Sequence, residues 1–235
     1  MREDTPQDLC LLKLLFMNGH LSRGHVRSGQ GNGKMLYGLG GLVIGMIIAL
    51  LIICPMQLQL SSALHSLMQL HLVDAIGEWD TVSSWRCSYD EDGNAEYTKL
   101  DSIRYPTSLG LFYSAVTDRI GLKPMEEEYI TMGMAAFGKS NRKLYDALKM
   151  MLSRSNLHRG MRRELLEEIK EDIAYNAQAL TEVVLRGFIK KLTKDGLPIV
   201  YGGGVALNSV ANGKLFKMKD HYIFPNPGDA GSALG

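Results

Sequence analysis

The spacing of apolar residues divides the chain into a strand-rich part followed by helices. Short apolar runs fill the stretch from Val73 to Leu100, and a turn at Asp90–Asn94 separates the last two of them. This pattern predicts a β-meander. Apolar residues then recur at helical spacing over Leu109–Ile120 and Asn141–Leu157 and, longest of all, over Arg163–Leu192. We therefore expect three helices after the meander.

Strand-like runs return near the C-terminal end of the sequence. Leu197–Tyr201 is short, apolar and rich in β-branched residues, which predicts a buried strand. Three glycines follow at once, and the apolar stretch behind them predicts a helix over Ala206–Met218. A last strand is expected at His221–Phe224. Strands on both sides of long helices indicate an α/β fold.

The glycine turn between that strand and that helix is the first candidate ligand site. It consists of Gly202, Gly203 and Gly204, and Asn208 follows four residues later. Glycines allow positive φ and carry no Cβ, so backbone N–H groups and a helix N-terminus can face an anion or a nucleotide. The turn has neither a G-x-G-x-x-G pattern nor a Gly-Lys-Ser/Thr sequence. A plain connecting turn explains such a sequence about as well.

Acidic residues give two further stretches to interpret. Asp74 ends the first strand, and Gly77 and Glu78 form the tight turn behind it. An Asp beside a glycine usually serves the turn itself, and the functional alternative is a carboxylate aimed at phosphate or metal. The run Glu126–Glu128 is interpreted as the solvated start of a short helix, because acidic side chains favour the positive end of the helix dipole.

The N-terminal third has a different character. Residues 1–35 are basic and end in a glycine-rich stretch, which indicates a disordered segment. Leu36–Cys54 has about nineteen residues without a charge, which meets the length of a membrane-spanning helix. A buried helix is the alternative. Residues 55–72 are assigned to a linker, in which His65 and His71 lie too far apart for two metal ligands on one helix face.

Composition narrows the classes of function. The chain has 235 residues, 46% hydrophobic and 22% charged, with a formal net charge of +1. These values are typical of one large or two small globular domains and give no reason to expect a nucleic-acid partner. The three cysteines are far apart and indicate neither a disulfide framework nor a zinc site. The protein is expected to be a single-pass membrane protein if Leu36–Cys54 spans a bilayer, and cytoplasmic otherwise.

Five blocks of sequence occur in a characteristic order. They are Val73–Trp79, Tyr105–Tyr113, Glu128–Ala135, Gly203–Asn208 and Gly228–Ala233. Together they closely resemble the O-carbamoyltransferases of nodulation-factor and antibiotic biosynthesis. The resemblance covers residues 73–235, roughly two-thirds of the chain, which we take as one carbamoyltransferase-like domain.

The resemblance implies an actin-like domain of the sugar-kinase and heat-shock ATPase superfamily, which is ribonuclease-H-like. It also implies an enzyme that uses carbamoyl phosphate and ATP, forms a carbamoyl-adenylate, and moves the carbamoyl group onto a hydroxyl acceptor. In the family's pattern Gly203–Asn208 resembles the adenosine and phosphate cradle, together with Gly231 and Ser232. The turn Asp74–Glu78 resembles a second phosphate-facing loop, and Asp229 resembles a ligand of a divalent metal, Mg or Fe. No residue is identified as the general base.

The resemblance is incomplete at both ends. The family's paired-histidine metal loop would lie upstream of Asp74, where the sequence does not show it. The family also continues beyond Gly235 into a second, adenylate-forming domain. With one lobe of the cleft incomplete, we expect weak or no transferase activity from this polypeptide alone. Two other functions stay open: a membrane-anchored, non-catalytic nucleotide-binding module, and a kinase of the same superfamily.

Overall fold

A computed structural model describes most of the chain from residue 68 onward, together with one short strand nearer the N-terminus. The described residues are 24–27, 68–77, 79–89, 95–154, 157, 160–161, 168–193, 197–215, 221–223 and 225–228. The predicted membrane-spanning segment Leu36–Cys54 lies outside them. Within the described part of the chain, we find no helix that combines the length and the apolar character needed to cross a bilayer.

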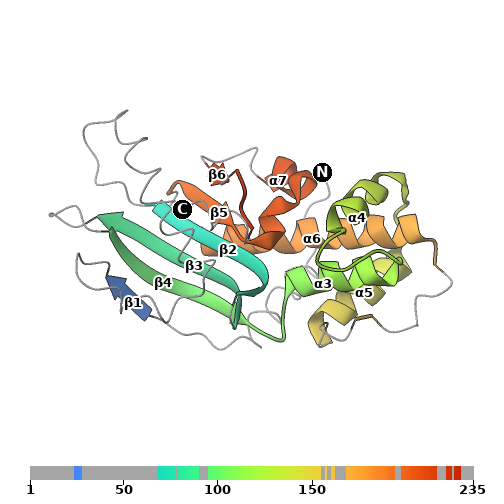
Figure 1. Cartoon of the computed structure of the whole chain (residues 1–235), viewed down its shortest axis with the longest axis horizontal. Helices are drawn as coiled ribbons and strands as arrows, with labels where there is room; N and C mark the ends of the chain where they lie inside the picture. The colour runs from blue at the N-terminus through green and yellow to red at the C-terminus, as the bar shows by residue number, and fades with distance from the viewer. Residues whose placement is uncertain are drawn as a thin grey trace.

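The described strands form one mixed, six-stranded sheet (Figure 1). Its strands are β1 (Gly24–Arg27), β2 (Met68–Gly77), β3 (Asp80–Tyr89), β4 (Ala95–Arg104), β5 (Ile199–Gly202) and β6 (His221–Ile223). The order across the sheet is β1-β4-β3-β2-β5-β6. The predicted meander is confirmed, because β2, β3 and β4 pair antiparallel. Both β5 and β6 run parallel to β2, so the sheet changes from antiparallel to parallel at its centre.

After the meander the chain forms several helices and then returns to the centre of the sheet at β5. They are α3 (Leu109–Arg119), α4 (Glu128–Met134), α5 (Arg142–Arg154), α6 (Lys170–Leu192) and α7 (Ser209–Leu215), with short 3₁₀ turns η1 (Ala135–Phe137) and η4 (Gly204–Leu207). The core joins buried side chains of the sheet, such as Val73 and Ile103, to those of α3 and α6, such as Phe112 and Leu180. Burial of this apolar surface is the main force that holds the layers together.

The start of α3 shows how the sequence fixes one of these contacts. Ser108 is the N-cap, and its Oγ accepts a hydrogen bond of 3.0 Å from the Leu111 backbone N–H. The same hydroxyl donates to the carbonyl oxygen of Ala75 at 2.7 Å. The cap therefore ends the loop and at the same time ties α3 to β2.

Strand β2 begins earlier than the sequence predicts. It starts at Met68 instead of Val73, so Met68–Leu72 lies in the sheet and not in the linker expected over residues 55–72. Residues 68–72 do alternate between apolar and polar, which is the period of a strand, but the polar ones are not on a solvated face: Gln69 and His71 are each 1% exposed. His71 Nε2 lies 3.3 Å from Thr193 Oγ1 just beyond α6, which explains how a histidine is accommodated in a central strand.

Two helices begin later in the chain than the sequence predicts. The long helix begins at Lys170 instead of Arg163, and its N-cap residue Ile169 has extended backbone. The helix expected from Ala206 is instead the 3₁₀ turn η4 followed by α7 from Ser209. Asn208 separates the two, because its Oδ1 accepts the Ala211 backbone N–H at 3.0 Å and so caps α7.

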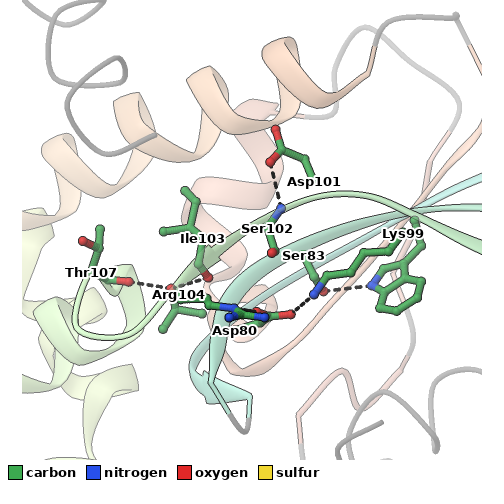
Figure 2. A network of polar contacts seen from close by, with 10 residues as sticks. Asp80, Ser83, Lys99, Asp101, Ser102, Ile103, Arg104 and Thr107 are labelled. Atoms are coloured by element: carbon green, nitrogen blue, oxygen red, sulfur yellow. Dashed lines mark hydrogen bonds and ion pairs between the residues drawn. The ribbon is translucent and has the colours of Figure 1, made fainter. Parts of the chain in front are cut away.

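A polar network at the ends of β3 and β4 fixes the connection to α3 (Figure 2). Asp80 forms ion pairs with Lys99 and Arg104, the second at 3.4 Å from Arg104 Nε. Thr81 Oγ1 donates to the carbonyl oxygens of Ile103, at 3.2 Å, and Thr107. Because these contacts join the start of β3 to the chain entering α3, they set where α3 lies against the sheet.

Candidate functional site

The described residues enclose a pocket of about 440 Å³ where β2, α3, the start of α4 and η4 come together. This volume lies within the range of small-molecule sites, about 300–1,000 Å³. Asp74 comes from β2, Tyr113 from α3, Glu128 from α4, and Gly204 and Asn208 from the glycine block. Segments from both halves of the described chain therefore build one cavity.

The three glycines of the predicted site have different roles. Gly202 is the last residue of β5, pairs with Leu72 and is buried. Gly203 has φ of +93°, and its backbone N–H donates to the Pro227 carbonyl oxygen at 2.9 Å. Gly204 alone of the three lines the pocket. The first two glycines thus serve the close packing of the turn, and the third provides an open backbone surface.

Asp74 and the glycine turn meet in space. A Cβ built on Gly204 would lie 3.0 Å from Asp74 Oδ1. That oxygen accepts a hydrogen bond of 2.7 Å from the backbone N–H of Ala75, which holds the carboxylate at the pocket wall. Two separate candidates from the sequence therefore belong to one site.

The remaining predicted site residues do not join this pocket within the described part of the chain. Gly77 ends β2 and pairs with Asp80. Glu78, Gly231, Ser232 and the predicted metal ligand Asp229 lie outside the described residues.

Asn208 lines the pocket, and Gln178 fixes its side-chain amide through two hydrogen bonds. Its Nδ2 donates to Gln178 Oε1 at 2.9 Å, and its Oδ1 accepts from Gln178 Nε2 at 3.1 Å. Tyr113, also in the wall, donates its hydroxyl hydrogen to the same Gln178 Oε1 at 2.7 Å. Burial raises the pKa of Tyr113 above its usual range, the hydrogen bond with Asn208 lowers it, and Glu182 and Glu128 raise it further. Tyr113 is therefore a neutral phenol at physiological pH.

The glutamates begin a short helix, as the sequence predicts, because Glu128 is the first residue of α4. Glu126 is exposed and pairs with Lys123 Nζ at 2.6 Å, and both Glu126 and Glu128 also line the pocket. Glu128 Oε1 accepts from Ser114 Oγ at 2.6 Å and from the Met125 backbone N–H at 2.7 Å, which orients the carboxylate. The signal that could have identified Glu128 is its place at the head of one of the five ordered blocks, although nothing local distinguishes it from its neighbours.

The electrostatics of the pocket differ from those of a simple phosphate cradle. Asp74, Glu126 and Glu128 contribute three carboxylates, and the described lining residues include no Lys or Arg. Carboxylates repel phosphate oxygens but accept hydrogen bonds from hydroxyl and amino groups. The pocket wall therefore suits the hydroxyl-bearing or amino-bearing part of a ligand better than its phosphates.

The divalent metal implied by the resemblance finds no ligand set in the described part of the chain. There is no group of three or more His, Cys, Asp or Glu side chains there that could hold an ion. His71 is buried in β2 beside Thr193, and it is not among the described residues that line the pocket.

Known proteins resemble this chain in part. The family model described as the carbamoyltransferase N-terminus matches residues 65–173. The uncharacterized protein sll1178 of Synechocystis is 34% identical over 196 residues, which cover 69% of this chain and 31% of the relative. The uncharacterized protein MJ1058 of Methanocaldococcus jannaschii is 28% identical over 195 residues, covering 69% of this chain and 32% of the relative. The chain thus spans about a third of the length of these relatives.

Among solved structures, a 15-stranded ParM filament from Clostridium botulinum aligns with a TM-score of 0.36 and 15% identity. The alignment covers 96% of this chain and 61% of that one.

Proposed function

Because the chain belongs to the carbamoyltransferase family through the N-terminal region matched at residues 65–173, we propose that it carries part of the active site of an ATP-dependent O-carbamoyltransferase. The observation that carries the proposal is the pocket itself. In it, Gly204 and Asn208 of the glycine block meet Asp74 of the first strand and Glu128 of α4.

The proposed fold is the actin-like, ribonuclease-H-like one. Supporting it is the strand order β4-β3-β2-β5-β6. Among these strands only β3 runs antiparallel to the central strand β2. Ligands in open sheets with parallel strands bind beyond the carboxyl ends of those strands. Asp74 near the end of β2 and Gly204 just after β5 occupy that position.

In the proposed reaction carbamoyl phosphate is hydrolysed to carbamate and inorganic phosphate, the carbamate oxygen displaces pyrophosphate from ATP to form a carbamoyl-adenylate, and the carbamoyl group then moves to a hydroxyl acceptor. In the transfer step the acceptor oxygen forms a bond to the carbamoyl carbon, the bond to the AMP phosphate oxygen breaks with its electron pair, and the acceptor proton passes to a base. Such acyl transfer needs a positioned carbonyl and hydrogen-bond donors for the developing oxyanion.

The described residues contribute binding and orientation to this reaction. Asp74 and Glu128 would accept hydrogen bonds from hydroxyl groups of the ribose or of the acceptor. The open backbone at Gly204 would allow a ligand to approach closely. The phosphates would lie away from the three carboxylates, because like charges in a partly enclosed pocket repel.

Calorimetric titration of the full 235-residue chain with ATP tests this proposal. We expect saturable binding, and we expect Gly204→Ala to weaken it about tenfold, or ~1.4 kcal/mol, because the added methyl group crowds Asp74 and the pocket. Gly213→Ala is the matched control, since a Cβ at Gly213 meets nothing within 4 Å. The absence of any nucleotide-dependent heat from the unmodified chain would contradict the proposal.

The nucleotide product distinguishes the proposed chemistry from that of a kinase. Carbamoyl-adenylate formation and transfer release AMP and pyrophosphate, whereas phosphoryl transfer releases ADP. Incubation with carbamoyl phosphate, ATP and a panel of hydroxyl acceptors, followed by separation of the nucleotides, gives the answer. Accumulation of ADP that depends on the acceptor would favour a kinase.

A further inference from the structure

We infer that Gln178, which lies behind the pocket wall on α6, is a positioning residue that gives the wall formed by Tyr113 and Asn208 the hydrogen-bonding polarity of a carbamoyl group. This inference rests on the proposed function and specifies how the same site distinguishes its ligand. Gln178 is 4% exposed and is not among the described residues that line the pocket.

The Gln178 amide uses its whole hydrogen-bonding capacity. Its Oε1 accepts from Tyr113 Oη at 2.7 Å and from Asn208 Nδ2 at 2.9 Å. Its Nε2 donates to Asn208 Oδ1 and to Glu182 Oε1, both at 3.1 Å. A primary amide has two acceptor sites and two donor hydrogens, so all four are engaged. A flip of the Gln178 side-chain amide would therefore break several hydrogen bonds at once.

Two groups outside this amide pair fix its direction independently. The Glu182 carboxylate only accepts hydrogen bonds, so the nitrogen of Gln178 must face it, and Lys214 Nζ holds that carboxylate at 2.8 Å from both oxygens. At the other end the Ala211 backbone N–H only donates, so the oxygen of Asn208 must face it, at 3.0 Å. Both ends demand the same arrangement, which makes the assignment of the amide atoms self-consistent.

This arrangement decides what Tyr113 and Asn208 present to a ligand. Tyr113 directs its hydroxyl hydrogen toward Gln178, which leaves an oxygen lone pair as its contribution to the wall. Asn208 Oδ1 is filled by Gln178 and Ala211, which leaves the second Nδ2 hydrogen. Tyr113 and Asn208 both line the pocket and both bond Gln178 Oε1, at 2.7 and 2.9 Å, so these two remaining sites are neighbours in the wall. The wall therefore holds one acceptor and one donor side by side.

A carbamoyl group is complementary to that pair. Its carbonyl oxygen accepts the Asn208 hydrogen and its NH₂ donates to the Tyr113 oxygen. An acetyl group has the same carbonyl but places a methyl group against the Tyr113 oxygen. A buried acceptor left unpaired in this way weakens binding by about tenfold or more.

Calorimetry on the full chain with two matched probes tests the inference. The probes are adenosine 5′-sulfamate acylated on nitrogen with a carbamoyl group, and the same compound acylated with an acetyl group. We expect the unmodified chain to bind the carbamoyl probe about tenfold more tightly. In Gln178→Leu the Tyr113 hydroxyl is free to turn toward the ligand, so the ratio of the two dissociation constants should fall to about one.

A second variant keeps the test informative if Gln178→Leu folds poorly. Tyr113→Phe leaves the hydrogen bonds between Gln178 and Asn208 in place and removes only the acceptor oxygen of the wall, so the two dissociation constants should again become about equal. A purely structural role for Gln178 and Tyr113 would leave the ratio of the two dissociation constants unchanged.

The outcomes separate this inference from the proposed function. Equal binding of both probes by the unmodified chain, or a preference that survives Gln178→Leu or Tyr113→Phe, overturns the role of Gln178 but leaves the nucleotide site in place. Binding of neither probe by the unmodified chain overturns the site and the inference together.

Discussion

The α-carbon of Gly203 lies directly against the backbone of Val73. A Cβ built on Gly203 would come within 2.3 Å of the Val73 carbonyl oxygen. This contact explains why β5 can turn so sharply beside β2: the turn after the strand packs on the strand next to it, with nothing between the two backbones. Residue 203 also has φ of +93°, which side-chain-bearing residues rarely adopt.

Gly203→Ala is therefore expected to destabilise the protein strongly. The left-handed backbone alone costs about 1–3 kcal/mol for a residue with a side chain, and the clash with Val73 adds to that cost. Urea denaturation followed by circular dichroism measures the difference. Gly213→Ala, in an uncrowded helical position, is the control and should be neutral or slightly stabilising. Equal stabilities for the two variants would show that the turn does not pack as described.

Gly110 has a similar role on the other side of the pocket. A Cβ there would lie 2.6 Å from the Ala75 backbone nitrogen, so Gly110→Ala must push α3 away from β2. We expect a loss of about 1–3 kcal/mol from overpacking, together with weaker ligand binding. The matched helical control is Gly133→Ala in α4, where a Cβ meets nothing within 4 Å. Thermal unfolding of both variants, with ATP titration of the first, provides the measurement.

Ser108→Ala removes the N-cap of α3 and the hydrogen bond from its hydroxyl to Ala75. Loss of a cap costs about 0.5–2 kcal/mol, and the buried Ala75 carbonyl also loses a donor, so we expect a value at the upper end. Ser153→Ala on α5 is the comparison, because that hydroxyl is exposed and bonds only within its own helix. A Ser108 variant no less stable than the Ser153 variant would contradict this account of the cap.

The two buried tyrosines predict how stability depends on alkaline pH. Burial raises the pKa of both Tyr113 and Tyr201 above the usual value near 10.0. Above pH 10 the unfolded chain therefore releases protons that the folded protein still holds. The stabilising contribution of both groups is complete below about pH 10 and is lost as pH rises beyond it.

Urea midpoints measured between about pH 9 and pH 11 test this direction. The midpoint should fall as pH rises, and the fall should be shallower in Tyr113→Phe, which has one tyrosine fewer to ionise on unfolding. The same variant should be less stable at pH 7, because Gln178 Oε1 loses a donor. A slope unchanged by the substitution would mean that Tyr113 titrates alike in both states.

Local patterns in the sequence predicted much of the fold. The meander, the short helix at the glutamates and the strand before the glycines are confirmed, because each depends on neighbouring residues and on period, although β2 begins at Met68. The start of β2 differs from the prediction although residues 68–72 have the period of a strand, and the polar residues there, Gln69 and His71, are buried in the sheet instead of lying in a linker.

The candidate site was predicted only in part. Sequence spacing singled out Asp74, the glycines and Asn208, and the fold brings Asp74, Gly204 and Asn208 into one pocket. Sequence spacing gave no reason to choose Glu128 or Tyr113 for that pocket, because their position relative to β2 arises from the packing of α3 and α4 on the sheet.

The sequence by itself determined the type and the approximate place of most strands and helices, since these follow from side-chain period and from local sterics. Only the tertiary structure decided that Gly203 packs on Val73 while Gly204 opens to the pocket, and that Gln178 orients Asn208. Those roles depend on contacts between residues far apart in the chain, and such contacts exist only once the sheet and its helices have come together.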